Sequence, residues 1–144
     1  NAGSLEKDLL ARYGGPRAPA LVESALRHID VLRQAGFEDI KVSLKSSDVL
    51  TTLAAYREIS GRTDCPLHLG VTEAGTAVQA AIKSSLGIGM LLAEGIGDTI
   101  RVSVTGTPSR KCPSLTGFCV RWGFAGAGSR SSPARPAAVV KSTW

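Results

Sequence analysis

CPLHLGVTEAGTAVQAAIKSSLGIGMLLAEGIGDTIRVSVT, at residues 65–105, is the stretch of sequence that decides the fold. Its first eight residues form a short apolar run entered through Pro66, and residues 99–105 form a second run of strand length. Between them, apolar side chains recur at helical spacing over residues 76–92. A helix between two short strands predicts a right-handed crossover that leaves the strands parallel.

The same alternation extends toward the start of the chain. Residues 37–44 have the length and β-branched content of a strand, and residues 48–60 and 19–35 have helical spacing of apolar side chains. A short helix capped by Ser4 and stopped by Gly14 precedes them. The sequence therefore predicts an α/β fold with three parallel strands, as a doubly wound domain or as part of a (β/α)8 barrel. In both, reactive groups lie just past the carboxyl ends of the strands.

Charge divides the chain into two parts. The 144 residues contain 17 Lys and Arg against 12 Asp and Glu, a formal charge of +5. Residues 1–108 carry all of the acidic residues, whereas residues 109–144 contain six Lys and Arg, both tryptophans and two of the three cysteines. We expect an ordered domain over 1–108 and an irregular, disordered tail over 109–144. No apolar stretch approaches the ~20 residues of a membrane span, no signal peptide is visible, and three cysteines suit a reducing compartment.

Polar residues stand at the three expected strand ends. Lys45 ends the first strand, Glu73 follows the second, and the third carries the hydroxyls of Ser103 and Thr105 next to Arg101. This set suits an anionic, oxygen-rich small molecule, with Lys45 as a point charge for phosphate and Glu73 as an acid, base or hydroxyl acceptor. The alternative is that polar residues mark strand ends only because loops face water.

Other candidate groups have structural explanations. His68 is expected to be an interior, hydrogen-bonded histidine, His28 to lie on a helix surface, and Cys65 has no partner at metal-ligand spacing. The sequence therefore predicts no metal site. Two Gly-x-Gly pairs neither follow a strand nor open a helix, so they are expected to mark close helix packing at 87–89 and a turn at 95–97.

Four segments carry a family resemblance: NAGSLEKDLLARYG at 1–14, VSLKSSDV at 42–49, PLHLGVTEAG at 66–75 and EGIGDTIRVSVTG at 94–106. They resemble 4-hydroxy-3-methylbut-2-enyl diphosphate synthase, the iron–sulfur reductase of the methylerythritol phosphate route to isoprenoids. The resemblance covers about residues 1–108. It implies a (β/α)8 barrel of which this chain, an internal fragment, holds about strands six to eight.

The resemblance also implies a site and a reaction. The family's contacts to 2-C-methyl-D-erythritol 2,4-cyclodiphosphate fall on Asn1, Lys45, Arg101 and Ser103, and Glu73 matches a glutamate that handles protons near the reacting carbons. The family reaction is a two-electron reductive dehydration that opens the cyclic diphosphate, with electrons from ferredoxin or flavodoxin. Its [4Fe-4S] cluster is held by three cysteines and a glutamate of a separate domain. The expected setting is the bacterial cytoplasm, as a homodimer, without membrane or nucleic-acid partners.

The resemblance stops after Pro108. The family continues with an acidic helix and a Cys-Pro-x-Cys motif, whereas residues 109–144 have no acidic residue and no helical periodicity. A one-base shift of frame lets residues 134–144 encode Cys-Pro-Thr-Cys-Gly-Arg-Cys, and residues 111–124 then encode an acceptable eighth helix. Ala134 and Ala137 stand where the first two cluster cysteines belong. We therefore expect this tail to be an out-of-frame translation, and the chain as printed to lack the cluster and the activity.

Two other functions are compatible with the residues alone. A small α/β body with a basic tail could bind nucleic acid through its phosphates, with a strong dependence on salt. Another phosphate-binding barrel enzyme would carry the same polar strand ends. The tail lacks the aromatic spacing of a stacking platform, and the resemblance favours the synthase.

Overall fold

The computed structural model describes residues 1–103. The predicted tail over 109–144, with Ala134 and Ala137, lies outside the described residues, as does the end of the predicted third strand. The described elements follow one another as η1 (Ala2–Ser4), α1 (Lys7–Tyr13), α2 (Ala18–Gln34), α3 (Val49–Ser60), β1 (His68–Val71), α4 (Ala77–Ala93) and β2 (Thr99–Val102).

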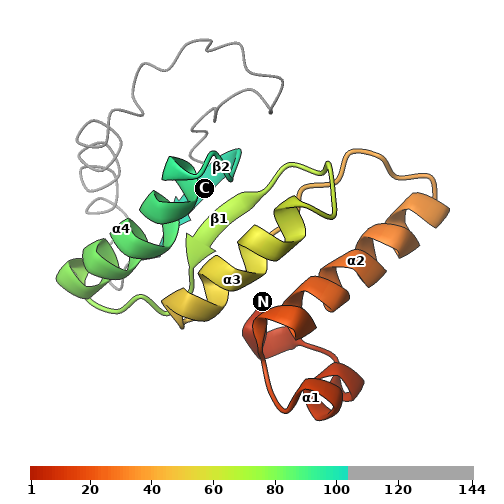
Figure 1. Cartoon of the computed structure of the whole chain (residues 1–144), viewed down its shortest axis with the longest axis horizontal. Coiled ribbons are helices and arrows are strands. Elements are labelled where there is room, and N and C mark those ends of the chain that lie inside the picture. Colours follow the sequence, from red (N-terminus) through yellow and green to blue (C-terminus); the bar gives the residue numbers. More distant parts are fainter. Residues whose placement is uncertain (104–144) are drawn as a thin grey trace, which may run out of the picture.

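The strands are parallel, as the sequence predicts. β1 pairs with β2 so that His68 lies opposite Thr99, and Val42 forms a parallel bridge to Leu67 at the other edge of β1. The helices α2, α3 and α4 lie side by side along one face of this small sheet (Figure 1). The described part of the chain is thus a layer of helices on a parallel sheet, with β1 between β2 and the segment that contains Val42.

The predicted strand over 37–44 is wrong in its extent, because the structure retains only the bridge at Val42. A side chain interrupts the ladder there: Leu44 N donates to the Tyr56 hydroxyl at 3.1 Å, and that hydroxyl donates to His68 O. On either side of this point, His68 N donates to Val42 O at 2.7 Å and Thr72 N donates to Ser46 O at 3.1 Å. The segment therefore runs alongside β1 in one register, with a tyrosine hydroxyl in place of a direct backbone link.

Three of the four predicted helices begin and end close to the expected residues. The Asp48 carboxylate accepts from Thr51 N at 2.6 Å and caps α3. Thr76 and Gln79 form a capping box at the start of α4. The first helix differs, because the Ser4 hydroxyl donates to Asn1 O within η1 and α1 begins only at Lys7. Ser4 is therefore not its cap, although α1 does end at Gly14 in the left-handed conformation (φ 65°).

The core lies between the sheet and the helices. Alternate residues of the sheet face the helices, and the largest fully buried side chains on both sides of that contact are Leu44, Leu67, Leu69, Val71, Tyr56, Ile59, Ile88 and Leu91. A Cβ at Gly87 would lie 2.8 Å from Val71 Cγ2, so this glycine lets α4 pack closely on β1, as its spacing predicts. Gly95 and Gly97 have positive φ in the turn before β2, which confirms the second prediction.

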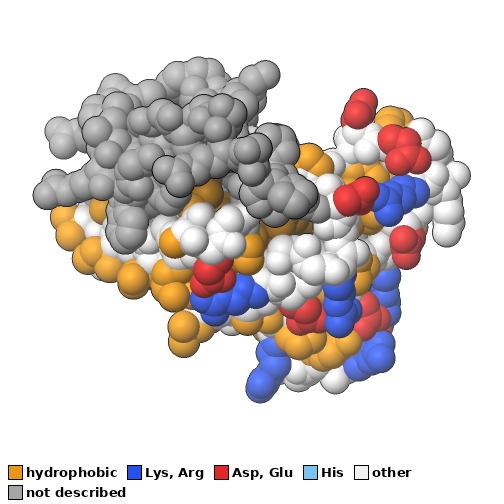
Figure 2. Space-filling model, turned by 45° about the horizontal axis from the view of Figure 1, so that its top comes forward, with side chains coloured by type: hydrophobic (Ala, Val, Ile, Leu, Met, Phe, Trp, Pro, Cys, Tyr) orange, Lys and Arg blue, Asp and Glu red, His pale blue; other side chains and the backbone are white. Residues whose placement is uncertain are grey.

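The surface has an uneven distribution of side chains. Hydrophobic side chains gather over the α4 side, whereas charged side chains gather over α1 and α2 (Figure 2). Among exposed large hydrophobic residues, four at a spacing of four form a stripe along α4, namely Val78, Ile82, Leu86 and Met90. Within residues 1–103, no helix combines the length and the apolar character needed to cross a bilayer.

Candidate anion-binding site

The face of the sheet opposite the core is polar. Successive residues of a strand point to opposite faces, so Ser43, Lys45, His68, Gly70 and Arg101 share the face that Leu44 and Leu69 avoid. The register places Gly70 opposite Arg101. Extending the Val42–Leu67 bridge by three residues places Lys45 opposite Gly70. Lys45, Gly70 and Arg101 therefore form one row across the sheet.

Lys45 crosses this row rather than pointing away from it. A Cβ at Gly70 would lie 3.1 Å from Lys45 Cε and 3.4 Å from Lys45 Cδ, so the lysine stem lies over the glycine. Lys45 is 8% exposed. Burial, and then the nearby charges of Arg101 and Lys41, lower the pKa of Lys45 to about 8.

The two cations of the row have no counterion within residues 1–103. All described salt bridges involve other residues, and no described side chain accepts a hydrogen bond from Lys45 or Arg101. A buried charge is costly unless it is paired, and here a second cation lies beside it. An anion bound here would offset this cost, since an ammonium and a guanidinium are both groups that bind phosphate oxygens.

The other predicted site residues lie around the same edge. Ser103 directly follows β2 and is half-buried, whereas Glu73 is exposed in the turn after β1. Glu73 has a left-handed φ of 52°, and Gly75 in the same turn has a φ of 87°. Asn1 is exposed at the start of η1, and the next residue, Ala2, donates its N–H to Lys45 O at 2.9 Å. The structure thus brings Lys45 and Arg101 together, with no contact between the Glu73 carboxylate and either cation.

His68 also belongs to this face, which the sequence analysis did not recognise. Its Nδ1 lies 2.8 Å from the Thr99 hydroxyl, which confirms a hydrogen-bonded histidine, although it is half-buried on this face and not in the core. Burial, followed by the charges of Lys45, Lys41 and Arg101, lowers the pKa of His68 to about 4. His68 is therefore neutral at pH 7. His68 lies two residues before Gly70 in the same strand, and residues two apart in a strand share a face. This spacing could have assigned His68 to the polar face from the sequence.

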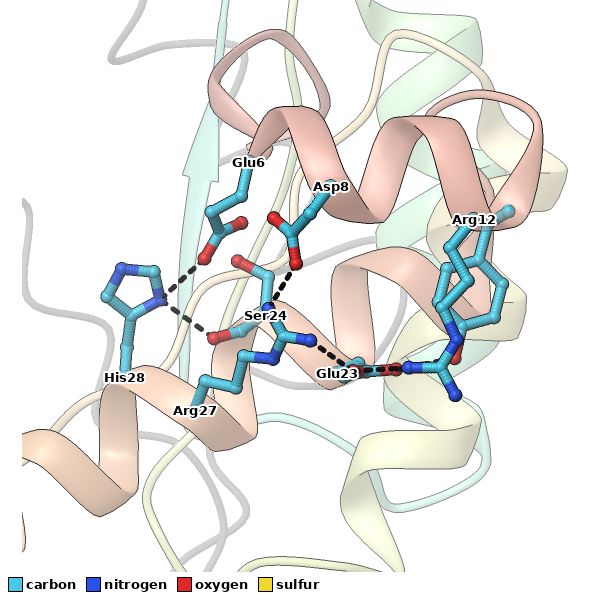
Figure 3. Close-up of polar contacts among 8 residues, drawn as sticks. Glu6, Asp8, Arg12, Glu23, Ser24, Arg27 and His28 are labelled. Carbon is cyan, nitrogen blue, oxygen red and sulfur yellow. Dashed lines mark hydrogen bonds and ion pairs between the residues drawn. The ribbon is translucent and has the colours of Figure 1, made fainter.

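A second charged cluster joins α1 to α2 (Figure 3). Arg27 binds Asp8 at 2.7 Å and Glu23 at 2.6 Å, and Arg12 binds Glu23 at 3.0 Å. Tyr13 donates its hydroxyl to the same glutamate. Both arginines are thus neutralised by carboxylates, so this cluster holds two helices together and offers no free charge to a ligand. His28 lies beside it, exposed on α2 as predicted.

A cavity of about 280 Å³ borders the segment that precedes Lys45. It is bounded by η1, α2 and residues 40–44, and its lining includes Asn1, Lys41 and His28. Lys45, Arg101 and Glu73 are not among its lining residues, so the cavity and the row are different features.

The described residues do not fit an iron–sulfur cluster. Cys65 is the one cysteine among residues 1–103, and it is buried before β1, at the end of that strand opposite to Glu73. No group of three potential metal ligands occurs in this part of the chain. Cluster ligation requires several thiolates, so no chemical step is assigned to a cluster on these residues.

Comparison with known proteins agrees with the parallel α/β architecture. The sequence model of the protein family described as the GcpE TIM-barrel domain matches residues 1–114. The chain belongs to the GcpE family. The 4-hydroxy-3-methylbut-2-en-1-yl diphosphate synthase (flavodoxin) of Geobacter sulfurreducens is 60% identical over 108 residues, which are 75% of this chain and 31% of that protein.

Two further relatives have the same name. The synthase of Hahella chejuensis is 60% identical over 108 residues, covering 75% of this chain and 29% of its own length. That of Lawsonia intracellularis is 56% identical over 113 residues, covering 78% of this chain and 32% of its own length. The family resemblance of the sequence is confirmed, and so is membership of a TIM-barrel domain. The chain spans about a third of the length of these curated GcpE relatives.

Proposed function

We propose that this chain is the part of a 4-hydroxy-3-methylbut-2-en-1-yl diphosphate synthase barrel that binds the diphosphate of 2-C-methyl-D-erythritol 2,4-cyclodiphosphate. The observation that carries the proposal is the row of Lys45 and Arg101, two cations brought together over Gly70 with no described counterion. The family match supports the identity of the ligand. In this assignment the strands are the sixth, seventh and eighth of the barrel.

Each candidate residue has a role that follows from its chemistry. Lys45 supplies a point charge to phosphate oxygens, and Arg101 adds a guanidinium that can bind two of them. The Ser103 hydroxyl and the Asn1 amide donate hydrogen bonds to diphosphate or hydroxyl oxygens. Glu73 holds or delivers a proton near the reacting carbons, since its carboxylate is exposed at the same edge and unpaired with the described cations.

The complete enzyme would carry out a reductive dehydration that opens the cyclic diphosphate. Two electrons would come from flavodoxin, which is part of the names of the relatives, or from ferredoxin. The [4Fe-4S] cluster would be held by another domain. Binding of the anion and handling of a proton are the contributions of residues 1–103. A homodimer in the bacterial cytoplasm, without nucleic-acid partners, completes the proposal.

The frame-shifted origin of residues 109–144 is a second part of the proposal. It is supported by the loss of acidic residues after Pro108 and by recovery of a Cys-Pro-Thr-Cys motif across Ala134 and Ala137 after a one-base shift. We expect the coding DNA to contain a one-base slip near codons 108–110, and the printed chain to bind no cluster. Sequencing of that DNA decides the question, and codons that cannot supply the motif would refute it.

Isothermal titration of the full 144-residue chain tests the binding role. We expect 2-C-methyl-D-erythritol 2,4-cyclodiphosphate to bind, and 2-C-methyl-D-erythritol, which lacks phosphate, to give no measurable heat. Equal binding of both compounds would contradict a site built on charge. Tight, salt-dependent binding of an oligonucleotide in place of the cyclic diphosphate would favour the nucleic-acid alternative.

A further inference from the structure

The cationic row contains one position without a side chain, and that position lies between the two charges. Gly70 stands in β1, opposite Arg101 on one side and opposite Lys45 on the other. A strand interior is an unfavourable place for glycine, which has no side chain to pack and loses conformational entropy on folding. Its φ is outside the left-handed region, so the backbone conformation does not require glycine here.

The space above Gly70 is filled by Lys45. A Cβ at this position would lie 3.1 Å from Lys45 Cε, 3.4 Å from Lys45 Cδ and 2.9 Å from Arg101 O. Two of these three atoms belong to the lysine stem. Any side chain at Gly70 would therefore occupy the path by which the ammonium crosses β1.

The path matters because the two cations start on strands that are not neighbours. Lys45 and Arg101 are separated by the whole of β1, and neighbouring strands lie about 4.8 Å apart. Lys45 approaches Arg101 only by lying flat across β1, although like charges repel each other. Lys41 and His68 on the same face add no negative charge, and the absence of a side chain at Gly70 leaves the space that the lysine stem occupies.

We propose that Gly70 is a positioning residue, which gives Lys45 its route across β1 and so sets its distance from Arg101. This inference rests on the proposed function only for the identity of the anion. The effect of Gly70 on Lys45 belongs to the protein without ligand and can be measured there.

The first measurement is the pKa of the Lys45 ammonium in the unliganded full chain, by NMR of labelled lysine, with Lys45→Ala to assign the signal. In Gly70→Ala the added methyl group displaces the stem, so the lysine gains water and moves away from Arg101. We expect its pKa to rise from about 8 toward the ordinary 10.5. Gly61→Ala is the matched control, because a Cβ there meets only Glu58 O at 3.9 Å and the pKa stays unchanged. An unchanged pKa in Gly70→Ala overturns the proposal.

The second measurement is a double-mutant cycle on binding of the cyclic diphosphate. We expect Gly70→Ala to weaken binding on the order of tenfold, the size of a misplaced charged hydrogen bond. In the Lys45→Ala background the same change should cost less than about twofold, because the lysine it displaces is gone. If the losses of affinity in Gly70→Ala and Lys45→Ala simply multiply in the double variant, the proposal is contradicted. If the natural chain binds no cyclic diphosphate, the proposed function fails, whereas the pKa of Lys45 still decides the role of Gly70.

Stability resolves the case in which Gly70→Ala does not fold. The contact with Arg101 O is a backbone contact and persists in every variant, whereas the contacts with Lys45 disappear in Lys45→Ala. We therefore expect the double variant to fold, and Gly70→Ala to lower the urea midpoint less in the Lys45→Ala background than in the natural chain, with the contact to Arg101 O as the remaining cost. A double variant that also fails to fold would assign the need for glycine to the backbone of β2, and would overturn the proposal.

Discussion

The two charged clusters of this protein are built on opposite principles. Between α1 and α2, Arg12 and Arg27 bind the carboxylates of Asp8 and Glu23 on an exposed surface, so charge is balanced within the cluster (Figure 3). Across the sheet, Lys45 and Arg101 share a polar face with no described carboxylate. The first cluster is complete without a ligand and the second is not. Unbalanced charge in a buried position, rather than the number of charges, is therefore what identifies the candidate site.

Removal of the Lys45 charge is expected to have the largest effect. In Lys45→Met, a stem of similar volume remains and the ammonium is lost, so binding of the cyclic diphosphate should weaken by about ten- to a hundredfold. The unfolding temperature should rise, because a buried, unpaired charge is gone. Titration calorimetry and thermal unfolding measure the two effects.

The matched change in the balanced cluster is Arg27→Met. It should leave binding within about twofold and lower the unfolding temperature slightly, since it removes two ion pairs on the surface. If Arg27→Met weakened binding as much as Lys45→Met, the distinction between the two clusters would be lost.

The two regions also differ in how deeply their tyrosine hydrogen bonds are buried. Tyr56 is fully buried and links Leu44 N to His68 O, so Tyr56→Phe leaves the buried Leu44 N–H unpaired and should cost about 2 kcal/mol of unfolding free energy, while His68 O keeps its bond from the Ser43 hydroxyl. Tyr13→Phe removes a partly exposed bond to Glu23 and should cost about 0.5 kcal/mol. Urea unfolding at pH 7 compares them, and equal losses would show that the Tyr56 hydroxyl does not bridge the segments.

The dependence of stability on pH tests the buried lysine of the cationic row. The pKa of Lys45 in the folded chain, about 8, lies below its ordinary value of 10.5, so folding disfavours the charged form. Stability from this group is complete above pH 10.5 and is lost as the pH falls through about 8. Between pH 8 and 10 the natural chain should therefore gain stability relative to Lys45→Met. Parallel pH profiles of the two proteins would contradict the low pKa.

The smallest effect is expected from a single exposed ion pair. Arg12→Gln removes one bond to Glu23, which keeps its bond to Arg27. The loss should be at most about 1 kcal/mol and should shrink in 0.5 M NaCl, because exposed pairs are screened by salt. Urea unfolding at two salt concentrations measures it, and a loss that is larger and independent of salt would indicate a stronger role for the cluster.

Much of the fold could be predicted from local patterns, and the errors have physical causes. Apolar spacing located α2, α3 and α4, and the crossover rule predicted parallel pairing of β1 and β2. The strand over 37–44 was wrong in extent because a distant side chain, Tyr56, bridges its ladder, and no local pattern signals such a contact. Ser4 suggested a cap, but its hydroxyl bonds within the preceding 3-10 turn.

The sequence suggested which residues to consider for a site but not how they lie relative to one another. Position at strand ends selected Lys45, Glu73 and Ser103 from the residues alone, and the family resemblance added Arg101 and Asn1. The register that aligns Lys45 with Gly70 and Arg101 depends on pairing between segments far apart in the chain, which a single sequence does not specify. The same register adds His68 to the polar face, where burial and then the neighbouring cations lower its pKa.

The pKa of the Lys45 ammonium, measured by NMR in the full chain with and without the cyclic diphosphate, shows directly whether the cationic row is an anion site. We expect a pKa near 8 in the free protein and a clear rise once an anion neutralises the row. A lysine that titrates near 10.5 in the free protein, or one whose pKa does not change when the compound is added, would contradict it.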